Sequence, residues 1–366
     1  MSLEVLQIVP RLPPAINGVG DYAHLLARQL RSAHQVKSQF LVCDPAWEGE
    51  TEIEGFQIER LQARRAAALV EKLSTSAPRI VLLHYVGYGY ENRGCPLWLK
   101  QGLKVWRRRN ASRRLIIMFH ELYAFGAPWR SSFWMSYPQQ LLAVGLARLA
   151  DRCVTNLHRY ALWLGSRAKQ HRDKIITIPV FSNVGEGLNG NPLDTRPPNM
   201  VIFGGTAWVE ELLGKHSAQT YFCCKALGIE RIITIGSPVG TAPKSTPVPI
   251  EERGFLKADQ VAEVIRSSRV GMMNYFPGYL GKSGVYAAYS ALGAVPLLPQ
   301  INPSILDGCI DGKTYLSANQ ITKRPANELL QQVASNAREW YETHNLSKTA
   351  EVYARVLGEI YQDFAC

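Results

Sequence analysis

The 366-residue sequence predicts an α/β protein made of two successive doubly wound domains, each with a mainly parallel sheet. Three observations support this fold class. The chain is about twice the length of a common single domain. Short β-branched runs alternate with helical patterns along nearly all of it. Residues 182–199 are dense in Gly, Asn and Pro and have no periodicity, which indicates a hinge between the two halves.

The first half contains six predicted strands joined by helical stretches. Tyr22–Leu30 is typical of these stretches, because Ala23, Leu26 and Leu30 recur at helical spacing. The predicted strands are Val5–Val9, Gln39–Cys43, Ile80–His84, Leu115–Phe119, Cys153–Thr155 and Ile175–Pro179.

The second half repeats the pattern. Its predicted strands are Met200–Phe203, Arg231–Ile235, Val270–Asn274 and Val295–Leu298. Its predicted helices are 216–227, 259–267, 284–292, 325–342 and 346–364. We therefore expect an N-terminal domain over 1–184 and a C-terminal domain over 185–345.

Composition narrows the class of protein. A formal net charge of +11 favours an anionic partner, such as a sugar nucleotide or an anionic membrane surface. Nucleic acid is not expected, since the basic residues are dispersed and form no recognised binding motif. The seven cysteines form no CxxC pair, so neither disulfides nor a zinc site is predicted. No apolar run reaches ~20 residues and no signal peptide is recognisable, which predicts a cytoplasmic protein.

The run 100–114 mixes a basic cluster with Leu103, Val105 and Trp106. One interpretation is peripheral contact with an anionic membrane, at its inner face. The other is a solvated crossover helix with a charged end.

Glycines follow the first predicted strand. Gly18 and Gly20 precede a helix, where backbone amides can approach a phosphate and the helix dipole favours an anion. A βα loop that needs glycines only for its turn is the alternative. The motif is no dinucleotide fingerprint, because Ala23 replaces its third glycine.

Two histidines end predicted strands. His120 follows Leu115–Phe119 and precedes Glu121 and a loop rich in aromatics, so it can hydrogen-bond a sugar hydroxyl or transfer a proton. His84 has the same placement and is an acceptor-side candidate, as is Glu121. A structural role at the strand end is the alternative for both histidines.

The second half has a candidate phosphate site at Lys282, Ser283 and Gly284. Ser283 is a good N-cap, and Lys282 lies beside the positive helix end, which suits the charge of a departing diphosphate. Gly205, after the first strand of this half, and Lys215 are further donor-side candidates. Solvated lysines are the alternative.

No Asp-x-Asp sequence occurs, so the carboxylate pair that often holds a metal on a sugar diphosphate has no obvious source. We expect no metal and no cofactor. P-loop, Gly-x-Ser-x-Gly and His-Glu-x-x-His motifs are also missing.

The opening Ile-Val-Pro-Arg-Leu-Pro-Pro-Ala-Ile-Asn-Gly-Val-Gly-Asp-Tyr-Ala, the Phe-His-Glu strand end and the late Gly-Lys-Ser-Gly-Val-Tyr-Ala-Ala-Tyr resemble the group-one (family-four-like) glycosyltransferases of bacterial polysaccharide or glycolipid assembly. The resemblance spans essentially the whole chain. It implies the GT-B fold, with two Rossmann-like domains facing a cleft and a last helix, 346–366, that crosses back to the N-terminal domain. It implies a nucleotide-sugar donor held mainly by the C-terminal domain and a saccharide or lipid-linked acceptor.

By position, Gly18 and Gly20 match the family's glycine loop, His120 its strand-end histidine, and Lys282, Ser283 and Gly284 its donor-phosphate helix start. The sequence departs from the family in two places. Leu280 and Ala288 stand where its pair of glutamates would fall, and Thr206 stands near its arginine, with the lysine displaced to 215.

The missing Asp-x-Asp sequence and the resemblance together predict a metal-independent, retaining glycosyltransferase that acts on a saccharide, lipid-linked or other small acceptor. Two alternatives remain open: a sugar-nucleotide epimerase, and a degenerate protein that binds a nucleotide sugar or a partner without turnover.

Overall fold

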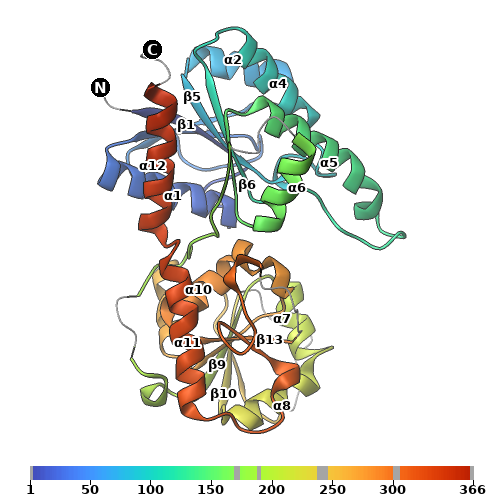
Figure 1. Ribbon diagram of the computed structural model, residues 1–366, viewed down its shortest axis with the longest axis vertical. Coiled ribbons are helices and arrows are strands. Elements are labelled where there is room, and N and C mark those ends of the chain that lie inside the picture. Colours follow the sequence, from blue (N-terminus) through green and yellow to red (C-terminus); the bar gives the residue numbers. More distant parts are fainter. Residues whose placement is uncertain (1–2, 169–173, 188–190, 237–245, 300–305, 363–366) are drawn as a thin grey trace. The chain divides into compact units, whose positions relative to one another are not determined.

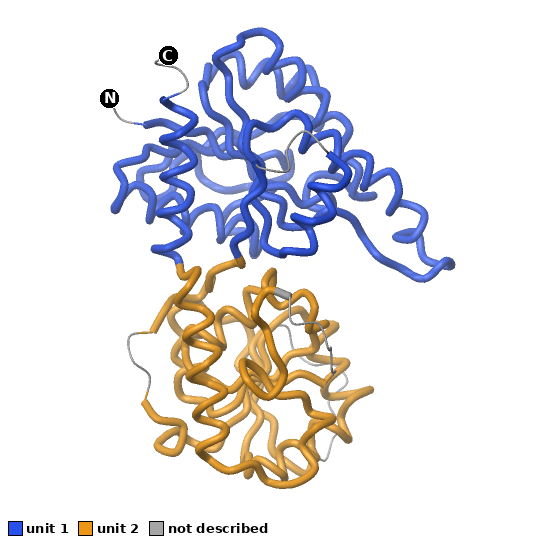
Figure 2. Tube along the Cα trace, in the orientation of Figure 1, with its two compact units in different colours: residues 1–178, 346–366 blue, residues 179–345 orange. Residues whose placement is uncertain are grey.

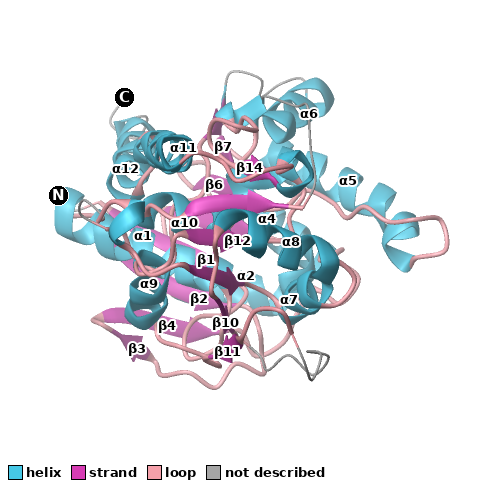
Figure 3. Cartoon of the chain, turned by 90° about the horizontal axis from the view of Figure 1, so that it is seen from below, coloured by secondary structure: helices cyan, strands magenta, loops and turns pink. Residues whose placement is uncertain are grey.

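The computed structural model describes residues 3–168, 174–187, 191–236, 246–299 and 306–362. The chain forms two compact units (Figure 2): unit 1 comprises 1–178 and 346–366, and unit 2 comprises 179–345. Each unit is a mainly parallel sheet flanked by helices, as the sequence predicts (Figures 1 and 3).

Unit 1 has an eight-stranded sheet in the order β3-β4-β2-β1-β5-β6-β7-β8. All its pairs are parallel except β3 with β4. The strands are β1 (Glu4–Val9), β2 (Lys37–Val42), β3 (Glu52–Ile53), β4 (Phe56–Arg60), β5 (Ile80–Tyr85), β6 (Arg114–Phe119), β7 (Arg152–Thr155) and β8 (Ile175–Thr177). Strands β1, β5 and β6 are almost entirely buried apolar residues, as expected of a sheet covered on both faces.

Helices cover both faces of this sheet. Helix α1 (Gly18–His34) packs against α12 (Leu346–Gln362), whereas α2 (Ala66–Thr75), α4 (Leu97–Arg108), α5 (Ser131–Leu149) and α6 (His158–Ala168) pack side by side in sequence order. Figure 1 shows these two groups on opposite sides of the sheet. Right-handed crossovers require this, because the strand order runs outward from β1 in both directions. A further helical segment among the described residues of unit 1 is α3 (Gly87–Tyr90).

Unit 2 has a six-stranded parallel sheet in the order β11-β10-β9-β12-β13-β14. Its strands are β9 (Asn199–Phe203), β10 (Arg231–Ile235), β11 (Ile250–Glu252), β12 (Val270–Met272), β13 (Val295–Leu298) and β14 (Leu316–Ser317). Its α-helices are α7 (Thr206–Leu213), α8 (Ser217–Leu227), α9 (Ala258–Arg266), α10 (Gly284–Leu292) and α11 (Asn327–Glu342), and 3-10 turns include η2 (Leu193–Thr195) and η3 (Pro277–Lys282).

The division between the units falls after Ile178, a few residues before the predicted boundary at 184. The segment that follows is hydrogen-bonded within unit 2: the amide of Val180 donates to the carbonyl of Gly281 at 2.8 Å, and that of Ser182 to the Tyr341 hydroxyl at 3.0 Å. The predicted hinge 182–199 therefore belongs to unit 2, apart from 188–190, which lie outside the described residues.

Strands β3, β4, β11 and β14 are not among the strands that the sequence predicts. Three of these four have only two or three residues, and all lie toward the sheet edges, where little apolar patterning is needed. No helix within the described ranges is long and apolar enough to cross a membrane. The described cysteines are free thiols.

Candidate functional site

Each sheet has one point where the strand order reverses, and ligands of such folds bind beyond the carboxyl ends of the strands at that point. In unit 1 the reversal lies between β1 and β5, and in unit 2 between β9 and β12. His84 is the penultimate residue of β5 and His120 directly follows β6, next to the first of these points. Gly205 follows β9, and Lys282 lies in the segment after β12.

In unit 1 a chain of buried polar side chains crosses four neighbouring strands. Ser38 on β2 accepts a hydrogen bond from Gln7 Nε2 on β1 at 3.0 Å, and Gln7 Oε1 is 2.9 Å from His84 Nε2 on β5. His84 Nδ1 is in turn 3.3 Å from His120 Nε2. The ring of Tyr22 on α1 meets both histidine rings edge-on, at 5.9 and 5.0 Å between centroids. The chain therefore lies on the face of the sheet that α1 covers.

This arrangement selects the tautomers of both rings. Gln7 donates from Nε2 to Ser38, so it presents Oε1 to His84, whose Nε2 must carry a proton and donate. A neutral His84 then accepts at Nδ1 from the Nε2 proton of His120. In this assignment a neutral His120 carries its proton on Nε2 and a lone pair on Nδ1.

His84, the acceptor-side candidate, lies inside unit 1. Its side chain is fully buried, and both ring nitrogens are already engaged. Burial, together with the neighbouring His120, lowers the pKa of His84 well below its usual value, so the ring is neutral. It therefore positions His120. Gln7, Ser38 and Tyr22 were missed, because a polar residue inside an apolar strand gives no sign of its partner on another strand.

The glycine loop after β1 has a steric reason for one of its glycines. A Cβ on Gly20 would lie 2.1 Å from the carbonyl oxygen of Arg11, so only glycine fits. The amide of Gly20 donates to the side chain of the N-cap Asn17 at 2.9 Å. Gly18 is the first residue of α1 and is exposed. A phosphate at this helix start would therefore meet Gly18 before Gly20.

Two carboxyl groups lie after the carboxyl ends of strands in unit 1. Glu121 directly follows His120 and is half-buried. Asp21, which the sequence analysis did not single out, lies in the first turn of α1, and burial raises its pKa to about 6. A carboxyl group that titrates near neutral pH can act as a general acid or base.

In unit 2 the turn after β9 and the start of α10 lie together. A Cβ built on Gly204 would come within 3.8 Å of the Val285 side chain in the first turn of α10. Gly205 is the N-cap of α7, and Ser283 is the N-cap of α10, with its hydroxyl accepting from the amide of Tyr286 at 3.2 Å. Two helix amino termini thus meet at the switch point of this sheet, each a favourable place for an anion.

Open space surrounds the glycines of these two helix starts. No atom lies within 4 Å of a Cβ built on Gly205 or on Gly284. Such space lets a ligand approach the backbone closely, which a side chain would prevent.

Tyr289 anchors α10 over the ends of β9 and β12. Its hydroxyl donates toward the carbonyls of Val201 and Met272, at 3.3 and 3.2 Å, and accepts from the amide of Phe203 at 3.0 Å. Gly271 makes room for the ring, since a Cβ there would lie 2.5 Å from it. This explains the tyrosine that ends the Gly-Lys-Ser-Gly-Val-Tyr-Ala-Ala-Tyr motif.

The two candidate lysines differ in their surroundings. Lys282 is half-buried at the end of η3, directly before the N-cap of α10, with its ammonium 5.4 Å from the centre of the Tyr279 ring. Lys215 is exposed in the turn after α7, and the described part of the chain offers it no ion-pair partner. The structure therefore places Lys282, Ser283, Gly284 and Gly205 in one region and gives no contact that joins Lys215 to it.

The positions of the missing glutamate pair are apolar and buried: Leu280 and Ala288 have almost no exposed surface. A different carboxylate, that of Glu211 on α7, does lie near the carboxyl end of β12, because Asn274, which follows this strand, donates a hydrogen bond to it. Sequence reasoning missed this pair, which is 63 positions apart in the chain.

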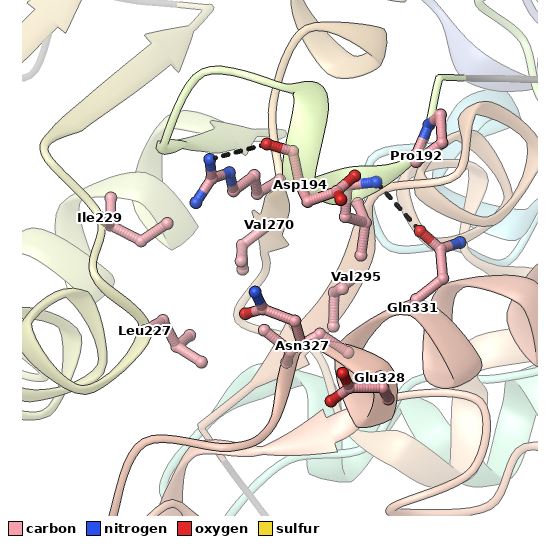
Figure 4. Close-up of a pocket in the computed structure, with 12 residues that line it drawn as sticks. Pro192, Asp194, Leu227, Ile229, Val270, Val295, Asn327, Glu328 and Gln331 are labelled. Carbon is pink, nitrogen blue, oxygen red and sulfur yellow. Dashed lines mark hydrogen bonds between the residues drawn. The ribbon is translucent and has the colours of Figure 1, made fainter.

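Two cavities lie elsewhere in the units. One of about 240 Å³ in unit 2 is bordered by Asp194, Arg269 and Glu328 and by Val270 and Val295, the first residues of β12 and β13 (Figure 4). The other, of about 590 Å³, lies at the amino ends of β1, β2 and β5 in unit 1. Each cavity lies at the amino ends of the strands of its own sheet, whereas the candidate residues lie at the carboxyl ends. Neither cavity is therefore the candidate site.

Among the described residues no three His, Cys, Asp or Glu side chains gather as metal ligands. The expectation of a metal-free site remains a prediction.

Comparison with known proteins identifies the fold. No family model matches the sequence. No curated protein matches it either. Solved structures do match, over nearly the full length of both chains, and they show that this protein has the GT-B architecture of two Rossmann-like domains.

Three of these structures illustrate the similarity. An α,α-trehalose 6-phosphate synthase from Burkholderia multivorans has a TM-score of 0.64 at 10% identity, covering 99% of this chain and 100% of that one. A putative UDP-N-acetylglucosamine 2-epimerase from Listeria monocytogenes has a TM-score of 0.63 at 12% identity, covering 100% and 97%. An α-glucosyltransferase in complex with UDP has a TM-score of 0.60 at 10% identity, covering 97% and 99%.

Proposed function

We propose that this protein is a glycosyltransferase that takes a sugar from a nucleotide-sugar donor and transfers it to a saccharide or lipid-linked acceptor without a bound metal ion. The observation that carries the proposal is the region of unit 2 where the amino termini of α7 and α10 meet beside Lys282. Amides, helix dipoles and one ammonium group together suit a diphosphate.

In the proposed reaction the bond between the sugar C1 and the diphosphate oxygen breaks, and a bond from C1 to an acceptor hydroxyl forms. The electron pair of the broken bond remains on the diphosphate, and the proton of the acceptor hydroxyl is released to a base or to the diphosphate itself. Lys282 and the start of α10 stabilise the negative charge that develops on the leaving group.

His120 is the residue of unit 1 assigned to the sugar. His84 contacts its Nε2 and Tyr22 packs edge-on against its ring, so both restrain its orientation. In the proposed role the ring hydrogen-bonds a sugar hydroxyl. An interaction held in a fixed geometry costs no reorganisation during the reaction and so favours the transition state.

A panel of UDP- and GDP-sugars tests the donor assignment. We expect one of them to raise the melting temperature and then to be hydrolysed or transferred, with the same rate in EDTA. Loss of turnover in EDTA that manganese or magnesium restores would refute metal independence. Stabilisation without turnover would instead support a degenerate binding protein. The anomeric configuration of the product, read by NMR, decides whether the reaction is retaining.

Lys282→Ala and Lys215→Ala form a matched pair of variants. We expect Lys282→Ala to lower turnover by ~100-fold, because the charge that develops on the leaving diphosphate would lose the ammonium group beside the start of α10. Lys215→Ala removes the same charge from an exposed turn and should change turnover much less. Equal effects of the two substitutions would assign both lysines to general attraction of an anionic substrate.

A sugar-nucleotide epimerase is the second candidate. Asp21, with its raised pKa, and Glu121 supply two carboxyl groups at the same edge of unit 1, which elimination and re-addition on a sugar require. Incubation of the donor without acceptor in heavy water separates the two functions. An epimerase that abstracts a carbon-bound proton incorporates deuterium into the sugar, whereas a transferase does not.

A further inference from the structure

Unit 1 presents an exposed apolar surface on α5 and the loop before it. We define the aromatic face as Trp129, Phe133, Trp134, Tyr137 and Leu141, all of them exposed; Trp129 and Trp134 are 85% and 70% exposed. The first half of α5 and its preceding loop extend away from the rest of unit 1 (Figure 1). The indole of Trp134 donates to the Pro128 carbonyl at 3.0 Å, which fixes the loop against the helix.

The aromatic face is a continuous stripe. Phe133, Tyr137 and Leu141 follow one another at four-residue intervals, and Trp134 lies beside them at a three-residue interval from Tyr137. The buried residues of α5 are Gln139, Leu142, Ala143, Leu146 and Ala147. At ~100° per residue these lie on the opposite side of the helix, so packing in unit 1 does not use the aromatic face.

The stretch of chain that contains the aromatic face is strongly basic, although Arg107 within it is paired with Asp151. Residues 92–150 contain ten Lys and Arg and a single carboxylate, Glu121, so this part of the chain carries most of the formal charge of +11. The part includes α4, which packs against α5, with Lys104, Arg108 and Arg109 exposed. From Leu122 to Ala150 there is no acidic residue at all.

We infer that the aromatic face docks on the surface of an anionic phospholipid bilayer. Tryptophan and tyrosine prefer the boundary between lipid headgroups and acyl chains, and basic neighbours add attraction to anionic headgroups. A second copy of this chain fits less well, because two strongly positive surfaces would repel each other. Nucleic acid would engage the cations but has no use for a stripe that includes Phe133 and Leu141 in a helix.

The inserting residues therefore differ from those of the run 100–114. Leu103 and Trp106 are fully buried in unit 1, so they cannot enter a membrane. The cations of that run remain at the surface and supply attraction, while the aromatic face supplies insertion. The inference does not rest on the proposed function, since membrane binding requires no sugar donor.

Vesicle sedimentation of the full chain tests the inference. The vesicles are phosphatidylcholine alone, or phosphatidylcholine with about 25% phosphatidylglycerol. We expect binding to the anionic vesicles, with a blue shift of tryptophan emission as Trp129 and Trp134 leave water. The variant Trp129→Ser/Trp134→Ser/Tyr137→Ser should bind at least ~30-fold more weakly. Neutral vesicles should bind the wild type weakly.

The matched control is Phe222→Ser/Phe255→Ser, which removes two exposed aromatic side chains from unit 2 and should leave vesicle binding unchanged. Circular dichroism verifies that each variant is folded. A serine variant of the aromatic face that still binds anionic vesicles like the wild type refutes the inference. So does wild-type self-association, measured by light scattering, that the same variant abolishes, or tight binding to a DNA duplex without any to vesicles.

Discussion

The buried chain from Ser38 to His120 can be tested by its effect on stability, independently of any substrate. His84→Leu keeps an apolar side chain of similar size in β5 but removes both ring nitrogens. Gln7 Oε1 then loses its donor, in a position with no exposed surface, and His120 Nε2 loses its acceptor. Each unpaired buried group costs roughly 1–3 kcal/mol, so for two groups we expect the unfolding free energy to fall by about 2–6 kcal/mol.

The companion variant is Gln7→Leu, which leaves His84 Nε2 and the Ser38 hydroxyl without this partner and should cost ~1–3 kcal/mol. In the double variant the unpaired group that each single variant creates in the other residue no longer exists. The double variant should therefore lose ~1–2 kcal/mol less than the sum of the single variants.

Urea denaturation of the four proteins measures this coupling. A second cycle combines His84→Leu with Leu73→Ala, a buried apolar position on α2, which packs against α4 and lies on the other face of the sheet. The effects of these two substitutions should add within ~0.5 kcal/mol. Additive losses in the Gln7 cycle would show that the two side chains contribute independently, and the reasoning about His120 would then lose its basis.

Three further outcomes are expected. His120→Ala should reduce sugar transfer strongly while nucleotide affinity barely changes; a variant that melts early but transfers normally would leave His120 a purely structural residue. Asp21 has a folded pKa of about 6 against 3.8 for the free side chain, so its ionisation opposes folding, and the stability it contributes at low pH is lost as the pH rises through 6. Asp21→Asn should thus raise the unfolding free energy by roughly 1–3 kcal/mol at pH 7 and leave it unchanged near pH 4. Urea denaturation at both pH values measures this difference, and an effect that does not depend on pH would contradict it. Gly271→Ala should destabilise the protein by ~1–3 kcal/mol, because the new methyl group meets the Tyr289 ring. Gly205→Ala adds its methyl group to open space, so it should keep the stability and weaken donor binding. Equal melting temperatures of these two variants would contradict the expected clash at Gly271.

Part of this architecture follows from local pattern. The alternation of β-branched runs with helical spacing predicts a doubly wound sheet in each half, because parallel strands need helical crossovers and buried strands need continuous apolar residues. The N-cap role of Ser283 was equally predictable, since capping depends on a residue and the three that follow it, and the structure confirms it with the bond to the Tyr286 amide.

The short edge strands and the position of the boundary between the units could not be predicted from local sequence. Strands of two or three residues carry too little periodicity to recognise. The segment after Ile178 resembles a hinge in composition, yet its amides are bonded to Gly281 and Tyr341, which lie about 100 or more positions further along the chain. A hydrogen-bond partner at that separation leaves no mark on the local sequence.

The sequence by itself determined which residues stand at or just after the carboxyl ends of the strands, and these include His84, His120 and Gly205. Only the tertiary structure decided what each of them faces. His84 and His120 have equivalent places in sequence, but β5 lies between β1 and β6, so His84 is enclosed by Gln7 and His120 and serves as a support. The physical reason is that burial and hydrogen-bond pairing depend on neighbouring strands, and strand order is a property of the whole sheet.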